Sequence, residues 1–159
     1  MQTLWQTQNR DFKGDNKIGK RGEKKIADYI RSLTKTIKVT DLSNDKAAQK
    51  DDIDMEVEST VGKYTVEVKT DTMAHVTGNL PFEETSKGGV GCMRRTKADW
   101  MIFYLKATGV LYWIRPQKWR EYVDKSHIPL KFIGEGGMVY LCKIEDLKKH
   151  GVIVKEDKY

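Results

Sequence analysis

An α/β fold with a central mixed β-sheet flanked by helices is the fold class that this sequence predicts. Three observations predict it: an amphipathic stretch near the N-terminus, two short segments that alternate polar with apolar residues, and two apolar runs separated by a short turn. The chain has 159 residues, which is enough for one domain with a hydrophobic core and short for two. We therefore expect a single domain over residues 1–159.

The first predicted element is a helix over about residues 18–33, in which apolar residues recur every three or four positions. Asp15 or Asn16 is expected to cap its N-terminus. A strand over residues 37–42 follows, and residues 43–50 are expected to form a polar loop.

Residues 51–71 (DDIDMEVESTVGKYTVEVKTD) predict a β-hairpin with one apolar and one acidic face. If the turn lies at residues 60–61, residues whose numbers sum to 121 oppose each other. On one face this register pairs only apolar residues and tyrosine: Ile53 with Val68, Met55 with Val66, and Val57 with Tyr64. On the other face the pairs are Glu58 with Lys63, Glu56 with Thr65, and Asp54 with Glu67. Lys69 follows two residues after Glu67, on the same face.

The rest of the chain alternates between strands and helices. In order, we expect a loop-rich segment with one short helix over 78–97, two buried strands over 98–114, a helix over 116–126 with Pro116 at its first position, a strand over 136–144, and a short helix over 145–151 ended by Gly151.

The opposed carboxylates of Asp54 and Glu67 are unfavourable for folding and suitable for a divalent cation. Like charges directly opposite each other destabilise a sheet. Mg²⁺ prefers hard oxygen ligands, and water and substrate phosphate complete its coordination. The pair therefore indicates a metal site, and the alternative is an acidic hairpin face that only contacts water.

Glu23 favours the metal site. At about 100° per residue it points with the apolar stripe of the first helix, where a carboxylate is costly unless it is paired or bound to a metal. Gly19 and Gly22 beside it would allow the helix to approach the sheet closely. The alternative is a glutamate near a helix N-terminus that is stabilised by the macrodipole.

These residues resemble the motif of the PD-(D/E)xK nuclease superfamily, which has the restriction-endonuclease-like fold. The matching residues are Glu23 in GKRGEKK, Asp54 in DDIDMEV, and Glu67 and Lys69 in VEVKT. The element order is similar to the α-β-β-β-α-β core of that family, which predicts a core over about residues 18–105 and a C-terminal elaboration over about 106–159. Ile53 replaces the motif proline, and Asp52 is a rival for the motif aspartate. Residues 77–104 further resemble phage and bacterial members and, more loosely, Holliday-junction resolvases.

The resemblance implies a Mg²⁺-dependent deoxyribonuclease, with Mn²⁺ able to substitute, that acts as an endonuclease in phage or bacterial DNA recombination, repair or restriction. Asp54, Glu67 and the backbone carbonyl of Val68 would hold the metal, and Glu23 would assist. Lys69 would orient the attacking water and counter charge on the phosphate. The alternative is a module of the same fold that binds nucleic acid without cleaving it, within a larger complex.

The charge distribution favours DNA as the partner. The formal net charge is +6, and the glycine-rich segment SKGGVGCMRRTK contains no acidic residue, so we expect it to contact phosphates. An ordinary solvated loop is the alternative. The predicted DNA-binding residues are Lys20, Arg21, Lys87, Arg94, Arg95 and Lys97.

The sequence also predicts where the protein acts. No apolar run approaches the roughly 18 residues that a membrane span needs, and Cys92 and Cys142 lack the spacing of a zinc site or a disulfide framework. We expect a cytoplasmic protein of a bacterial cell or phage-infected host, with no membrane partner and with a homodimer as an alternative to the monomer.

Overall fold

A helix, a β-meander and a second group of strands follow one another in this computed structural model, which describes residues 12–87, 89–134 and 136–159. In chain order the elements are α1 (Phe12–Ser32), β1 (Thr36–Asp41), α2 (Lys46–Lys50), β2 (Met55–Ser59), β3 (Gly62–Asp71), α3 (Ala74–Thr77), β4 (Asn79–Ser86), β5 (Gly89–Val90), α4 (Cys92–Arg95), β6 (Trp100–Leu105), β7 (Val110–Ile114), α5 (Pro116–Lys125), β8 (Leu130–Gly134), β9 (Gly137–Lys143), α6 (Ile144–Lys149) and β10 (Ile153–Lys158).

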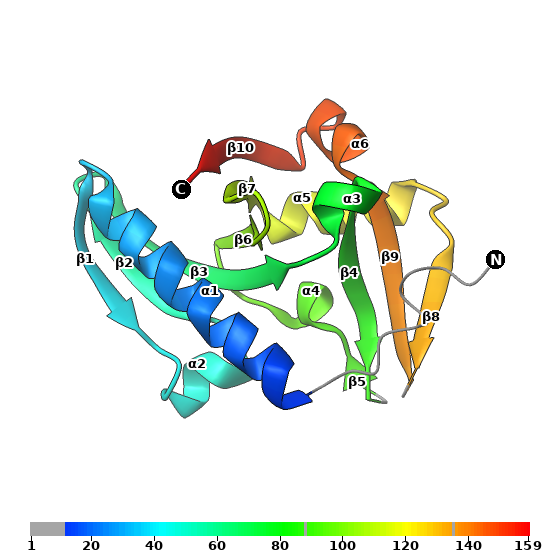
Figure 1. Cartoon of the computed structure of the whole chain (residues 1–159), viewed down its shortest axis with the longest axis horizontal. Coiled ribbons are helices and arrows are strands. Elements are labelled where there is room, and N and C mark those ends of the chain that lie inside the picture. The colour runs from blue at the N-terminus through cyan, green and yellow to red at the C-terminus, as the bar shows by residue number, and fades with distance from the viewer. Residues whose placement is uncertain (1–11, 88, 135) are drawn as a thin grey trace.

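These strands form two sheets (Figure 1). The larger sheet has six strands in the order β1-β2-β3-β6-β7-β10, and the smaller has four in the order β5-β4-β9-β8. Strands β3 and β6 run parallel, whereas the other neighbours in the large sheet are antiparallel. The predicted α/β class with a central mixed sheet flanked by helices is therefore confirmed.

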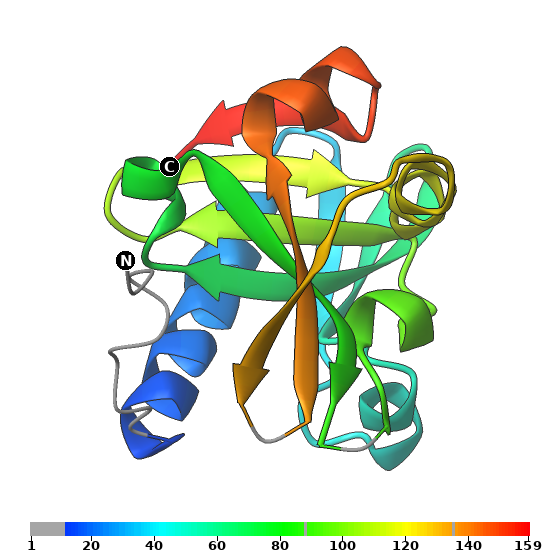
Figure 2. The same cartoon turned by 90° about the vertical axis from the view of Figure 1, so that its right-hand side faces the viewer.

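Two hydrophobic clusters cover the opposite faces of the large sheet. Along β6, Ile102 belongs to the cluster under α1, whereas Met101 and Phe103 belong to the cluster on the other face. That second cluster includes Trp119 of α5, whose ring stacks on Phe82 of β4 at a centroid distance of 5.1 Å. In Figure 2 the long strands of the small sheet cross in front of β3, β6 and β7. Helix α1 and the small sheet with α5 thus lie on opposite sides of the large sheet.

Helix α1 is longer than predicted. It begins at Phe12, so Asp15 lies in its first turn, Asn16 lies inside it, and the prediction that one of them caps it was wrong. Residues 13–17 are polar or glycine and carry no helical periodicity that could signal the extra turn. The predicted polar loop also contains α2, whose N-cap residue Asp45 accepts a hydrogen bond from the Ala48 N–H at 2.9 Å.

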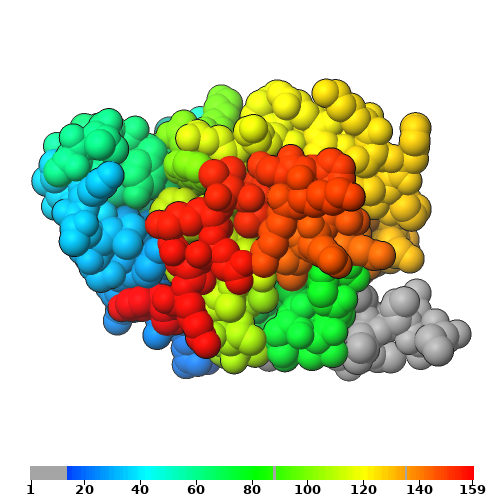
Figure 3. All heavy atoms as spheres, turned by 90° about the horizontal axis from the view of Figure 1, so that it is seen from above, coloured from blue at the N-terminus to red at the C-terminus, as the bar shows by residue number. Residues whose placement is uncertain are grey.

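The predicted strands and helices of the C-terminal half are present as β6, β7, α5, β9 and α6, and Gly151 follows the last of these helices with a φ of 70°. The small sheet was not predicted, because β4 falls in the segment expected to be loop-rich and pairs with β9, more than 50 residues away. Strands β7 and β10 extend the large sheet, and Figure 3 shows α6 and β10 across one face of the molecule.

Candidate active site

The β2–β3 hairpin has the predicted register. Its strands pair as Met55 with Val66, Glu56 with Thr65, Val57 with Tyr64, and Glu58 with Lys63. The ladder stops there, because the Val68 N–H donates to Oδ2 of Asp54 at 2.7 Å and the Ile53 N–H donates to the Ala48 carbonyl at 3.0 Å. The predicted cross-strand pairs of Asp54 with Glu67 and of Ile53 with Val68 are therefore absent from the ladder. The Asp54 N–H donates instead to the Val66 carbonyl at 2.9 Å, and the Asp54 side chain accepts from the Val68 N–H.

This local geometry brings the carboxyl groups of Asp54 and Glu67 into hydrogen-bonding contact. Glu67 is only 5% exposed. Burial, opposed by Lys69 and reinforced by Asp54, raises the pKa of Glu67 to about 8. Burial also raises the pKa of Asp54, although the hydrogen bond from Val68 opposes the rise. Both carboxyl groups of the pair are therefore harder to ionise than they would be in water.

Lys69 and Cys92 complete the surroundings of Glu67. The Lys69 Nζ lies 2.9 Å from the Glu67 Oε1, and the Cys92 thiol donates to the same oxygen at 3.5 Å. Burial disfavours the charged form of Lys69, but the neighbouring Glu67 carboxylate and Cys92 raise the pKa of Lys69 above its ordinary value. Lys69 is thus held as a cation beside the carboxyl pair, as its place in the E-x-K motif predicted. Sequence reasoning gave Cys92 no role, because nothing in the local pattern places α4 against β3.

Glu23 reaches the carboxyl pair because α1 approaches β3 very closely. A Cβ atom on Gly22 would lie 1.8 Å from the Thr70 Oγ1, so only glycine fits this crossing. Gly19 has no neighbour within 4 Å among the residues that the structure describes, and its predicted role in the close approach was wrong. Burial, and then the negative charges of Asp54 and Asp41, raise the pKa of Glu23 to about 7. Asp54 is thus close enough to Glu23 for its negative charge to disfavour ionisation of Glu23.

A cavity of about 300 Å³ opens beside these carboxylates. Its lining includes Glu23 and Asp54 together with Asp41, which the sequence analysis missed. Asp41 ends β1 and pairs in register with Met55, directly after Asp54. An aspartate one residue before the end of the strand predicted over 37–42, ahead of the hairpin, was the available signal. The other lining residues are Lys20, Lys24, Ala27 and Arg31 of α1, with Val39, Ser43, Asn44 and Met55.

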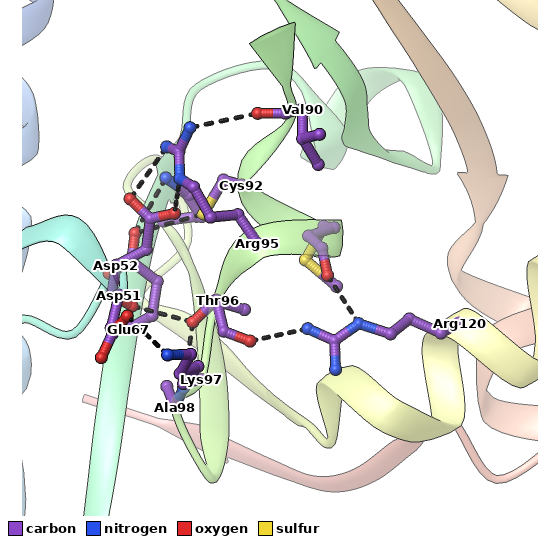
Figure 4. A network of polar contacts seen from close by, with 12 residues as sticks. Asp51, Asp52, Glu67, Val90, Cys92, Arg95, Thr96, Lys97, Ala98 and Arg120 are labelled. Atoms are coloured by element: carbon purple, nitrogen blue, oxygen red, sulfur yellow. Dashed lines mark hydrogen bonds and ion pairs between the residues drawn. The ribbon is translucent and has the colours of Figure 1, made fainter.

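Most basic side chains of the segment SKGGVGCMRRTK form ion pairs with acidic residues of this chain. Figure 4 shows the pairs that Arg95 and Lys97 form. Arg95 donates to both carboxylate oxygens of Asp52, at 2.5 and 3.0 Å. Lys97 lies 3.0 Å from an Asp51 oxygen. Both acids lie in the turn after α2, more than 40 residues before the arginine and lysine that they bind. The positive charge of the segment is therefore largely neutralised, although the segment contains no acidic residue of its own.

Arg94 is bound in the same way, by Glu84 at 2.8 Å and by two contacts to Asp124 at 2.7 and 3.2 Å. Of the other predicted DNA-binding residues, Lys87 is exposed after β4, and Lys20 and Arg21 are exposed on α1. The structure therefore brings Glu23, Asp54, Glu67, Val68, Lys69 and Lys20 together and leaves the remaining basic residues outside this cluster.

The carboxyl pair fits the ligand set of a hard divalent cation, because Mg²⁺ is bound through one or two carboxylates and completes its shell with water and phosphate oxygens. Over residues 12–87, 89–134 and 136–159, no group of three or more His, Cys, Asp or Glu side chains is already arranged around a metal position.

Comparisons with known proteins found no matching family model, no similar curated protein and no similar solved structure. Among the helices of the described residues, none has the length and apolar character required to cross a membrane.

Proposed function

We propose that this protein is a metal-dependent deoxyribonuclease that hydrolyses DNA phosphodiester bonds. The observation that carries the proposal is the contact between Asp54 and Glu67, with the Lys69 ammonium 2.9 Å from Glu67 and Glu23 beside the pair. A buried carboxyl pair that forces both pKa values upward has no benefit for folding, and perturbed pKa values of this kind concentrate at functional sites. The arrangement is best explained as a pair of cation ligands.

The order and direction of the elements support a restriction-endonuclease-like core. Helix α1 is followed by the antiparallel strands β1, β2 and β3, then by α4, and then by β6 parallel to β3. When α2, α3, β4 and β5 are left out, this order is similar to the α-β-β-β-α-β order of the PD-(D/E)xK proteins that the sequence resembles. Strands β7 and β10 and the small sheet are additions to that core.

In the proposed reaction each residue has a distinct task. Asp54 and Glu67, with the Val68 carbonyl, would hold Mg²⁺ or Mn²⁺, which when bound supplies electrostatic stabilisation of the charge that develops on the phosphate. Because the pKa of Glu67 is about 8, Glu67 would have to lose its proton to become a ligand, so metal binding is linked to pH. Lys69 holds the attacking water by hydrogen bonding and places positive charge beside the phosphate. Glu23, with a pKa of about 7, can exchange a proton with water at neutral pH.

The test is a substrate panel of linear duplex, single-stranded, nicked, flapped and four-way-junction DNA, with RNA as a further substrate. Each is incubated with Mg²⁺, with Mn²⁺, or with EDTA. We expect metal-dependent cleavage of DNA that Glu67→Ala and Lys69→Ala abolish, while DNA binding persists because basic residues elsewhere supply most of the affinity. Glu23→Gln should reduce the rate less severely, as an auxiliary group.

Glu56→Gln is the matched control, because Glu56 lies on the same face of the hairpin, is half-exposed, and pairs with Thr65 rather than with Glu67. It should cleave like the wild type. Robust cleavage by Glu67→Ala would remove the proposed site. Binding without cleavage under every condition would favour the alternative, a non-cleaving nucleic-acid-binding module of the same fold. The broader setting that we propose is recombination, repair or restriction in the cytoplasm of a bacterial cell or phage-infected host.

A further inference from the structure

One face of α1 forms a basic wall beside the carboxylates. Lys20, Lys24 and Arg31 all line the cavity of about 300 Å³ that contains Glu23 and Asp54. Their spacings of four and seven residues place them in one row along a helix. Both lysines are exposed. A ligand that reaches the carboxylates through this cavity must therefore pass along a row of cations.

These lysines differ from the cations of the segment after β4. Neither Lys20 nor Lys24 makes an ion pair with any residue that the structure describes, whereas Arg94, Arg95 and Lys97 each do. A phosphate that binds to Arg94 must first displace carboxylates that are already hydrogen-bonded to it, and breaking such pairs is unfavourable. A phosphate that binds to Lys20 or Lys24 breaks no ion pair among the residues that the structure describes, although the charge of Lys20 also acts on Glu23 and Asp41. Arg31 is intermediate, because its only described ion pair is an exposed contact with Asp28 at 3.0 Å.

The rest of the lining determines which part of a nucleic acid can bind. Outside α1, the polar lining residues are the acids Asp41 and Asp54 and the neutral hydrogen-bonding residues Ser43 and Asn44. The described lining contains no aromatic side chain on which a base could stack. The lining therefore favours the sugar-phosphate backbone over the bases. A volume of about 300 Å³ is at the lower end of ligand-binding cavities, which run from about 300 to 1,000 Å³, so it holds part of one strand.

We infer that this cavity binds the phosphate backbone of a single nucleic-acid strand, independently of base sequence, through Lys20, Lys24 and Arg31. The inference rests on the proposed function, because it defines how the strand to be cut reaches Asp54, the member of the carboxyl pair that lines the cavity. The unpaired strand is selected because it enters a narrow cavity. The phosphates lie along the rim formed by α1, since the acidic floor repels them where no cation is bound.

The experiment measures binding of the full chain to a short fluorescent single strand in EDTA, so that cleavage plays no part. Affinity is followed against salt concentration for the wild type and for Lys20→Ala/Lys24→Ala. Single strands release counterions with a slope of about 0.7 per phosphate contact, so losing two contacts should reduce the salt slope by about 1.4. Lys20→Arg/Lys24→Arg, which keeps the charges, should retain the wild-type slope.

The matched control is Lys118→Ala/Lys125→Ala. Both lysines are exposed on α5, on the opposite face of the large sheet, and this variant loses the same net charge. It should leave the slope near that of the wild type. Equal slopes for the two alanine variants would overturn the inference. Tighter binding of a duplex than of its single strand would overturn the selection of an unpaired strand, and affinities that differ more than tenfold among sequences would overturn independence from the bases.

The strand-binding experiment and the cleavage experiment can fail independently of each other. If no DNA is cleaved but the slope falls as expected, the strand site stands and the nuclease proposal fails. If DNA is cleaved and the slope does not change, the strand site fails and the carboxylate site stands.

Discussion

The buried carboxyl of Glu67 should make the protein less stable as the pH rises. Its pKa is raised from 4.5 to about 8 in the folded chain. Between these values the folded state keeps a proton that the unfolded state has released, so the free energy of unfolding falls as the pH increases. One such proton changes that free energy by about 1.36 kcal/mol per pH unit. From about pH 5 to about pH 7.5, the wild type should lose roughly 3 kcal/mol through this group.

Glu67→Gln removes the titration and keeps the shape of the side chain. Urea unfolding of both proteins, followed by tryptophan fluorescence in EDTA at several pH values, gives the difference in unfolding free energy between them. We expect this difference to shift by roughly 3 kcal/mol in favour of the variant between about pH 5 and about pH 7.5. Glu23 and Asp54 remain in both proteins, so taking the difference between the two unfolding free energies removes most of the pH dependence that these two residues cause.

Glu56→Gln serves as the control, because Glu56 is half-exposed on the same hairpin face. The unfolding free energy of Glu56→Gln should differ from that of the wild type by the same amount at every pH. If the difference in unfolding free energy between the wild type and Glu67→Gln stays constant across the pH range, the pKa of Glu67 is not raised by burial. The physical basis of the cation site is then lost.

Two further predictions concern the metal and the helix crossing. Saturating Mg²⁺ or Mn²⁺ should raise the melting temperature of the wild type by mass action, and the effect should shrink or vanish in Asp54→Asn; equal responses in thermal melts would argue against a carboxylate ligand. Gly22→Ala should destabilise the protein by about 1–3 kcal/mol, because the new methyl group would overlap Thr70. Gly19→Ala, in the same helix with open space around it, should be neutral or stabilising by up to about 1 kcal/mol. Urea unfolding compares the two alanine variants, and equal destabilisation would contradict the close crossing.

The sequence alone determined the hairpin and therefore most of the carboxylate cluster. Side chains alternate with a period of two along a strand, so a shift of the pairing register by one residue would have moved Met55, Val57 and Val66 to the solvent-facing side of the hairpin. Only one register pairs the apolar residues, and that register places Asp54 near Glu67 and Lys69. Helical periodicity likewise placed Glu23 toward the sheet, because the apolar stripe of α1 specifies which face is buried.

Only the tertiary structure decided which cations are available to a ligand. Arg95 is neutralised by Asp52, 43 residues away, and Arg94 by Asp124, 30 residues away. The small sheet similarly depends on the pairing of β4 with β9. Local patterns report which face of an element is buried. They carry no information about which distant side chain meets an exposed charge, because that contact exists only after loops and sheets have packed together.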